Sequence, residues 1–291
     1  MPSGGRAGPA PSDGRAGSWL FAEVACASRA GSERPNEDLV IAGPSWIVVL
    51  DGATAAPGVD GGCAHGVAWL VGRLGGALAA ALAAGDGRPL AAVLESAVET
   101  TMAAHSGTCD LGDPDSPSAT VAMVRAGPGG VDYLVLGDSP VVFSLPGGGV
   151  RVVSDDRLER LPGGRPYTLE LVRRMRNAPG GFWVAAARPE AARQAVCGTV
   201  AGARGVGVLT DGVTRLVEWY GWSWDELVAA LDGRGPEAVI QAVRELETAR
   251  GPLSGKRHDD ATAAWARTGR PAASDVDPGG HHRAAALGAD P

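Results

Sequence analysis

The chain has 291 residues, of which 45% are hydrophobic and 5% aromatic, and its formal net charge is −7. This length allows one large domain or two small ones, with a core built mainly from Ala, Val and Leu. The acidic balance and the absence of any Lys/Arg block argue against nucleic acid as the main partner. The longest apolar stretch, residues 67–84, is interrupted by Arg73 and glycines, so we expect no membrane span and no membrane partner.

Both ends of the chain differ in composition from its middle. Residues 1–17 and 269–291 are predicted to be disordered tails, which leaves residues 18–268 as a single domain. The first tail lacks the apolar centre of a signal peptide, so we expect a cytoplasmic protein. No cysteine belongs to a C-x-x-C pair, and no histidine stands at the usual zinc-ligand spacing. We therefore expect reduced, mostly buried thiols.

In chain order, the hydrophobic pattern predicts strands separated by blocks of helix. Strands are expected at 20–27, 39–42, 46–50, 119–125, 131–136, 141–145, 150–154, 182–186, 206–210 and 261–266. Helices are expected at 63–84, 89–109, 168–177, 224–231 and 236–250. Because the helices fall in blocks and do not alternate with single strands, the pattern indicates an α+β fold.

Four aspartates stand beside small or turn residues at widely separated points: Asp38, Asp51, Asp211 and Asp259. Two of them end the apolar runs 47–50 and 206–210 and are followed by glycine. A buried strand that stops at a carboxylate and turns at glycine places that carboxylate at the sheet edge, and two such strands side by side would direct both at one spot. Mg²⁺ and Mn²⁺ prefer such oxygen ligands, so the sequence predicts a carboxylate metal centre.

Five short motifs, in order, carry a resemblance to a known family. They are Asn36-Glu37-Asp38, Leu50-Asp51-Gly52, Gly137-Asp138-Ser139, Thr210-Asp211-Gly212 and Asp259-Asp260. Over residues 20–267 the chain resembles a divergent bacterial-type member of the protein phosphatase 2C family, which are metal-dependent serine/threonine phosphatases. The resemblance implies a four-layer α-β-β-α sandwich with two central antiparallel sheets. The helices expected at 63–84 and 89–109 would form one outer layer, and the C-terminal helices the other.

The resemblance also implies how two Mn²⁺ or Mg²⁺ ions are held. Asp51 would bridge both ions, and the Gly52 carbonyl would complete one coordination sphere. Asp211 and Asp259 would hold the first ion. Two cations so placed share one water, lower its pKa and hold the bridging hydroxide in line with phosphorus.

The remaining implied site residues surround this pair of ions. Glu37 would hold the second ion through water, with Asp38 ordering the waters nearby. Asp138 matches a position that in bacterial members helps to bind a third, weaker ion. Asp38 and Asp51 are thus the expected catalytic carboxylates, with Arg34 as the candidate phosphate contact.

The positions that contact substrate in the family are changed here. An arginine five residues before the Asp38 position is replaced by Glu33, and Arg34 follows one residue later. Pro140 stands where an arginine is common, and Arg215 stands where an acidic residue is common. Residues 155–166, which contain three arginines, fall where the family has a variable flap.

These features favour an enzyme that removes phosphate from phosphoserine and phosphothreonine of a phosphorylated protein in signalling. Two alternatives stay open. One is a catalytically weak or inactive phosphatase-like regulatory module that binds a phosphoprotein, because the substrate-contact positions are changed. The other is a phosphatase of a small metabolite. The sequence leaves open the substrate, the paired kinase, the native metal and the oligomeric state.

Overall fold

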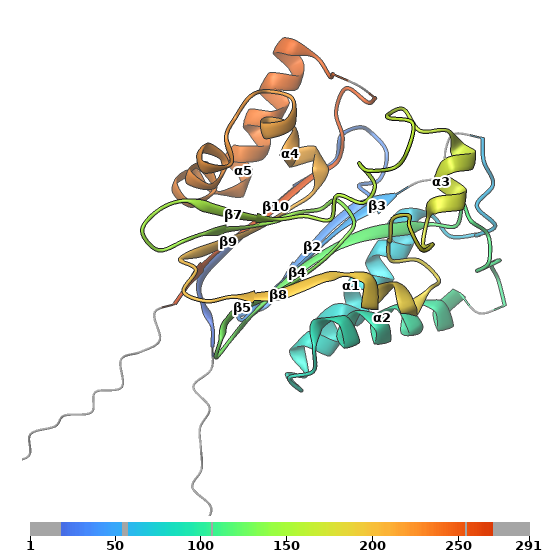
Figure 1. The fold of residues 1–291 in the computed structure, drawn as a ribbon, viewed down its shortest axis with the longest axis horizontal. Helices are drawn as coiled ribbons and strands as arrows, with labels where there is room; N and C mark the ends of the chain where they lie inside the picture. The colour runs from blue at the N-terminus through green and yellow to red at the C-terminus, as the bar shows by residue number, and fades with distance from the viewer. Residues whose placement is uncertain (1–18, 54–57, 106, 254, 270–291) are drawn as a thin grey trace, which may run out of the picture.

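The computed structural model describes residues 19–269 apart from 54–57, 106 and 254, and its described strands form two five-stranded antiparallel sheets (Figure 1). The first sheet has the order β1-β10-β9-β6-β7. Its strands are β1 (Phe21–Arg29), β6 (Val141–Ser144), β7 (Val150–Val153), β9 (Gly205–Leu209) and β10 (Ala261–Thr268). The second sheet has the order β2-β3-β4-β5-β8. Its strands are β2 (Asp38–Ala42), β3 (Trp46–Ala53), β4 (Ser118–Gly127), β5 (Gly130–Leu136) and β8 (Val196–Val200).

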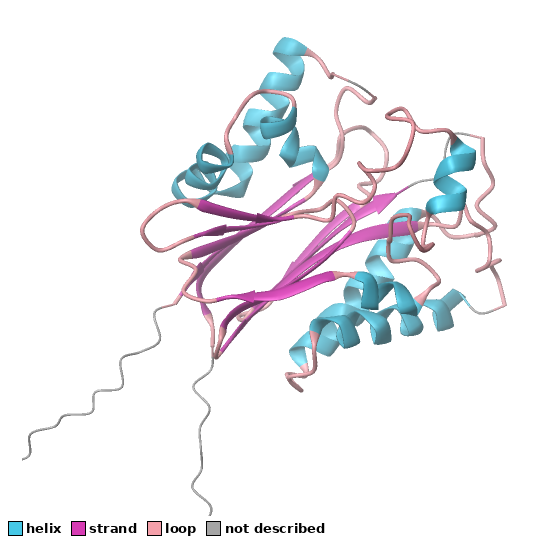
Figure 2. Ribbon diagram, viewed as in Figure 1, coloured by secondary structure: helices cyan, strands magenta, loops and turns pink. Residues whose placement is uncertain are grey.

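Helices cover both outer faces of the paired sheets (Figure 2). The second sheet is covered by α1 (Val67–Ala83) and α2 (Leu90–His105). The first is covered by α4 (Asp211–Glu218) and α5 (Trp224–Arg250). Shorter helices, α3 (Leu169–Met175) and the 3₁₀ helix η1 (Pro189–Gln194), lie at the α1/α2 side (Figure 1). This arrangement confirms the predicted four-layer α-β-β-α sandwich.

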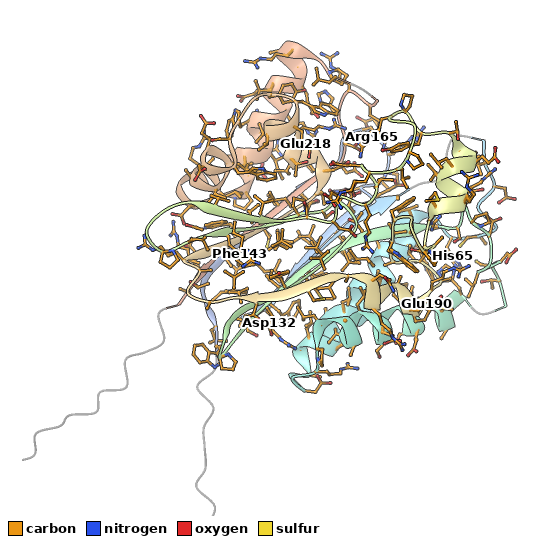
Figure 3. The ribbon with its side chains drawn as sticks, in the orientation of Figure 1. His65, Asp132, Phe143, Arg165, Glu190 and Glu218 are labelled. Carbon is orange, nitrogen blue, oxygen red and sulfur yellow. The ribbon has the colours of Figure 1, made fainter. Side chains whose placement is uncertain are left out.

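The central strand β3 shows why its sequence is apolar without alternation. Ile47 and Val49 point into the core between the sheets, where Phe143 also lies (Figure 3). Val48 and Leu50 point to the other face, into the core under α1 and α2. Successive side chains on a strand point to opposite faces, so a strand buried on both faces needs apolar residues at every position.

Some predicted elements differ from the structure at their ends. The helices expected to begin at 63 and to end at 109 begin and end instead at Val67 and His105. The strand expected at 182–186 forms only isolated bridges, Arg176 with Phe182 and Ala119 with Ala185. The helices expected at 224–231 and 236–250 form α5, whose helical backbone is interrupted at Gly235, where φ is 82°.

Strand β8 and helix α4 were not predicted. Four of the five residues of β8 are exposed, so the strand lacks an apolar alternation that could reveal it. The predicted tails lie outside the described residues except for Gly269. Within the described part of the chain, no helix combines the length and apolar character needed to cross a membrane.

Candidate metal centre

Asp38 and Asp51 are direct neighbours in the second sheet. Asp38 begins β2 and lies opposite Asp51 of β3 in the antiparallel register. The strand β3 continues through Gly52 to Ala53, so the expected turn after Asp51 is wrong. A Cβ at Gly52 would lie 2.4 Å from Val67 Cγ1 and 2.6 Å from the Glu37 carbonyl oxygen. Glycine is required here for close packing against the start of α1.

Asp211 approaches from the other sheet. It follows β9 as the first residue of α4, so the turn expected at this Asp-Gly is also wrong. A Cβ at Gly212 would lie 2.0 Å from the carbonyl oxygen of Asp260, so glycine again serves a close backbone approach. Strands β3 and β9 belong to different sheets that pack face to face. The two Asp-Gly motifs therefore meet across the sandwich and not as neighbours in one sheet.

A hydrogen bond from Thr210 to Asp38 joins the two sheets at this point, and Thr262 holds Thr210 in place. The hydroxyl of Thr210, the residue before Asp211, donates to Asp38 Oδ2 at 2.9 Å. The same hydroxyl oxygen accepts from the Thr262 backbone N–H at 2.9 Å. Thr210 and Thr262 are fully buried, and Asp38 is 7% exposed. Asp38 is thus held by a polar contact that originates in the opposite sheet.

The carboxylates repel one another strongly. The pKa of Asp51 lies well above its ordinary value because of burial and then the charges of Asp211, Asp38 and Asp138. Burial and the charges of Asp138 and Asp259 raise the pKa of Asp211 to about 7. Burial also raises the pKa of Asp38 to about 7, against the opposing hydrogen bonds of Thr262 and Thr210. A group of carboxylates in this state fits divalent cations, which supply the missing positive charge.

Asp259 differs from these carboxylates because it is paired with cations. Arg215 donates to Asp259 Oδ2 at 2.7 Å, and Lys256 Nζ lies 3.1 Å from Oδ1. Arg215 is 5% exposed and also pairs at 2.6 Å with Glu247, which has no exposed surface. The sequence showed Arg215 only as a departure from the family pattern. Its structural role is to anchor Asp259 to the helical layer through Glu247.

The buried Glu247 carboxylate also contacts two further basic side chains. Arg244 donates to its Oε2 at 2.8 Å, and His258 Nδ1 lies 2.7 Å from the same oxygen. Arg244 also donates to the Asp259 carbonyl oxygen at 2.5 Å. His258 and the backbone of Asp259 are therefore held by one network that includes Glu247 and Arg244 of α5.

Asp260 positions the loop that carries Glu37. Its Oδ2 accepts from the Glu37 backbone N–H at 2.7 Å, and its Oδ1 accepts from the Gly31 N–H at 2.8 Å. The Glu37 carbonyl oxygen in turn accepts from the Gly52 N–H at 3.1 Å. Glu37 and Gly52 are thus placed together at the edge of the second sheet, next to Asp51. The sequence did not assign a role to Asp260.

Asp138 belongs to the same group of carboxylates, because its charge raises the pKa of Asp51 and Asp211. Burial raises the pKa of Asp138, while the positive charge of Arg165 opposes this rise. Arg165 lies on the exposed loop before α3, near Glu218 of α4 (Figure 3). Arg34 is exposed on the loop before β2, and within the described part of the chain it forms no ion pair. The other loop arginines are paired, Arg157 with Asp155 and Arg160 with Asp156.

The prediction of mostly buried thiols is wrong. Cys26 and Cys197 are exposed, and Cys63 and Cys109 are partly exposed. The last two lie 3.2 Å apart, Sγ to Sγ, beside two histidines. The signal in the sequence was a histidine two residues after Cys63 and another four residues before Cys109.

The sandwich and its carboxylate cluster define the class of metal-dependent serine/threonine phosphatases. The profile of the protein phosphatase 2C family matches residues 27–247, and the chain belongs to this family. No protein with a curated description matches the sequence.

Solved phosphatase structures share the fold. The PPM Ser-Thr phosphatase MsPP from Mycobacterium smegmatis, in complex with cacodylate, is 18% identical with a TM-score of 0.57, over 86% of this chain and 100% of that one. The Mycobacterium tuberculosis phosphatase PstP/Ppp is 20% identical with a TM-score of 0.53, over 85% and 99%. The PstP catalytic domain in complex with 2 manganese ions is 18% identical with a TM-score of 0.53, over 86% and 99%.

Proposed function

We propose that this chain hydrolyses phosphoserine and phosphothreonine in proteins with divalent cations held by the carboxylate cluster. The observation that carries the proposal is the convergence of Asp38 and Asp51 from one sheet with Asp211 from the other, each with a raised pKa. Packing alone gives no reason to bring these like charges together, whereas a bound cation does. Family membership and a neighbour that carries manganese support the same metal dependence.

The ligands divide between the two sheets. From the second sheet come Asp51 and the Gly52 carbonyl, with Glu37 and Asp38 beside them. Asp211 and Asp259 come from the first sheet side. We assign two Mn²⁺ or Mg²⁺ ions to this set, with Asp138 available to a third. Bound there, the cations supply a lowered pKa for water and positive charge facing the phosphoryl oxygens.

The chain's own residues do the rest of the work. The Thr210 hydroxyl keeps Asp38 in place, and Arg215 and Asp260 keep Asp259 and the Glu37 loop in place. For the phosphate of the substrate, we assign Arg34 from the loop before β2 and Arg165 from the loop before α3. Both are exposed, and the charge of Arg165 acts on Asp138. A guanidinium suits this task because its fork of donors matches phosphate oxygens.

The test compares the full chain with an Asp211→Asn variant. Hydrolysis of p-nitrophenyl phosphate and of a phosphothreonine peptide is measured with Mn²⁺, with Mg²⁺ and with EDTA. We expect cation-dependent hydrolysis that Asp211→Asn abolishes, with preference for the peptide. Asp86→Asn, an exposed aspartate in the turn before α2, is the matched control and should be fully active.

Two outcomes would contradict the proposal in different ways. A folded protein that hydrolyses neither compound with either cation would sink the enzyme assignment and favour a phosphatase-like module that binds a phosphoprotein. Preference for small phosphate esters over the peptide would instead move the substrate class to metabolites. A cytoplasmic location stays a prediction.

A further inference from the structure

A second cluster of ligand-type side chains, which contains none of these carboxylates, lies at the helical layer formed by α1 and α2. It consists of Cys63, His65, His105 and Cys109, and one ligand atom of each lies within 4.8 Å of all the others. Two come from the loop before α1, one from the last turn of α2 and one from the loop that follows. Figure 3 places His65 at the α3 side of α1.

The distances between the ligand atoms approach those of a tetrahedron around one metal ion. Cys63 Sγ lies 3.2 Å from Cys109 Sγ, 3.6 Å from His105 Nδ1 and 3.8 Å from His65 Nδ1. His65 Nδ1 lies 3.3 Å from Cys109 Sγ. Zinc with its usual bond lengths to sulfur and nitrogen gives edges of about 3.4–3.8 Å between tetrahedral ligands. Each of these four distances differs from the corresponding zinc edge by about 0.6 Å or less.

The surroundings orient both imidazole rings. Trp69 of α1 stacks on His65, with centroids 4.0 Å apart and planes at 19°. The same indole meets His105 edge to face at 4.4 Å. The two loops are joined where the Asp110 N–H donates to the Gly62 carbonyl oxygen at 2.8 Å. Gly62 has a φ of 63°, a left-handed conformation that suits glycine.

His105 is a buried member of the cluster. It is only 4% exposed, and its Nε2 has no hydrogen-bond partner in the described part of the chain. Its Nδ1 faces the Cys63 sulfur, so its polar contacts lie within the cluster. The ring nitrogen that faces the cluster is therefore Nδ1.

We propose that Cys63, His65, His105 and Cys109 bind one Zn²⁺ as a structural site. Two thiolates and two neutral imidazoles cancel the charge of Zn²⁺, and four protein ligands leave no open position for substrate. Sulfur and imidazole favour zinc, whereas the carboxylate centre favours Mg²⁺ or Mn²⁺. A disulfide between the two cysteines would account for neither histidine, and the sulfurs lie 3.2 Å apart, well beyond a bond of about 2.05 Å.

The zinc would connect the two helices close to the carboxylate centre. Cys63 and His65 immediately precede Val67, the first residue of α1. The Val67 side chain packs beside Gly52, as the 2.4 Å approach of its Cγ1 to a Cβ built there shows. Zinc binding therefore fixes the start of α1 to the end of α2 and so holds Val67 against the strand that carries Asp51.

The test is the zinc content of the full chain, purified under reducing conditions without chelator. To separate this site from the carboxylates, zinc is measured by mass spectrometry in an Asp211→Asn background. We expect about one zinc per chain that survives dialysis, and less than about a tenth of that in Cys63→Ser/Cys109→Ser. Cys26→Ser/Cys197→Ser, which changes the two exposed cysteines, is the matched control and should keep its zinc.

Cobalt provides an independent readout. Co²⁺ added to the metal-free Asp211→Asn protein should give the sulfur-to-cobalt absorption of a tetrahedral site, absent from the Cys63→Ser/Cys109→Ser protein. The proposal is overturned by folded protein that contains no zinc and takes up none, or by an intact mass two hydrogens lower that indicates a disulfide. It is equally overturned if the zinc persists after loss of both cysteines. Because none of these results requires hydrolysis, the proposal can fail or hold independently of the proposed function.

Discussion

The carboxylate centre and the cluster of two cysteines and two histidines are two sites in one sandwich that offer different kinds of metal ligand. The first uses hard oxygen ligands at the meeting point of two sheets, while the second uses sulfur and imidazole between the ends of two helices. The carboxylates repel one another and carry raised pKa values. The second cluster combines two cysteine sulfurs with two imidazoles and contains no carboxylate.

The two sites therefore depend on their metals in different ways. The carboxylates repel one another whenever the chain is folded, because the two sheets hold them close together. A bound cation reduces this unfavourable electrostatic free energy. The Cys/His cluster is compatible with the fold without metal, and a metal adds a connection between two loops. Removing the metal from the first site should therefore lower the stability of the folded protein in a pH-dependent way. Removing it from the second site should loosen the attachment of α1 to α2.

The largest effect on stability should come from Arg215, the cationic partner that distinguishes Asp259 from the other carboxylates. Arg215→Met removes the guanidinium and leaves Glu247 without that partner in the core. We expect the free energy of unfolding to fall by about 3–5 kcal/mol. Urea denaturation of the metal-free protein measures it. Arg267→Met, which breaks exposed pairs with Glu23 and Asp232, is the control and should cost less than about 1 kcal/mol. Equal losses in both variants would contradict the assigned role.

A smaller but specific effect should follow Asp51→Asn, which disables the carboxylate centre alone. Asp51 lies opposite Asp38, and burial followed by the charges of Asp211 and Asp38 raises its pKa well above its ordinary value. We expect hydrolysis in Mn²⁺ to fall at least about 100-fold, with the zinc content unchanged. Steady-state kinetics and metal analysis of the same preparation measure both. Loss of zinc together with activity would show that the two sites are one system.

The stability of the metal-free protein should depend on pH through the carboxylate centre. The folded pKa values of Asp38 and Asp211 are about 7, above their ordinary value of 3.8, so the folded state binds more protons in between. The stabilisation is complete below about pH 4 and is lost as pH rises through 7, which makes the protein about 1–3 kcal/mol less stable at pH 7.5 than at pH 5. Urea denaturation at the two pH values measures it. Asp211→Asn should reduce this change in the free energy of unfolding between the two pH values. An unchanged difference would assign the effect to other groups.

The smallest effect should come from the loop before α3. Arg165→Ala removes an exposed guanidinium that acts on Asp138, and we expect KM for the phosphopeptide to rise about 5- to 10-fold with kcat nearly unchanged. Arg160→Ala changes a neighbouring arginine that pairs with Asp156 and serves as the control. A similar rise in KM for both variants would indicate a general charge effect of the loop.

Much of the fold followed from the sequence because its strongest patterns are local. The apolar run 46–50 predicted a buried strand, and the motifs around Asp51 and Asp211 predicted carboxylates that converge. The same local reasoning placed turns after both aspartates, because a glycine needed for close packing looks the same in sequence as a glycine needed for a turn.

The features that the sequence did not reveal depend on distant contacts. Cys63 and Cys109 come together only because α1 and α2 pack as a pair and bring their loops side by side. The role of Arg215 depends on ion pairs with Glu247 and Asp259, which lie far along the chain. Local sequence patterns cannot reveal such pairs. Strand β8 is recognisable only from its pairing with β5, since its own residues are mostly exposed.

The hydrogen bond from Thr210 to Asp38 has a mechanical consequence, because it bridges strands that share no backbone ladder. A cation bound by both Asp51 and Asp211 would form a second connection between the two sheets at the same end of the sandwich. Sliding of one sheet over the other would then be resisted at that end. Amide hydrogen exchange should slow together at the ends of β3 and β9 when the cation binds, although the two strands exchange no backbone hydrogen bond.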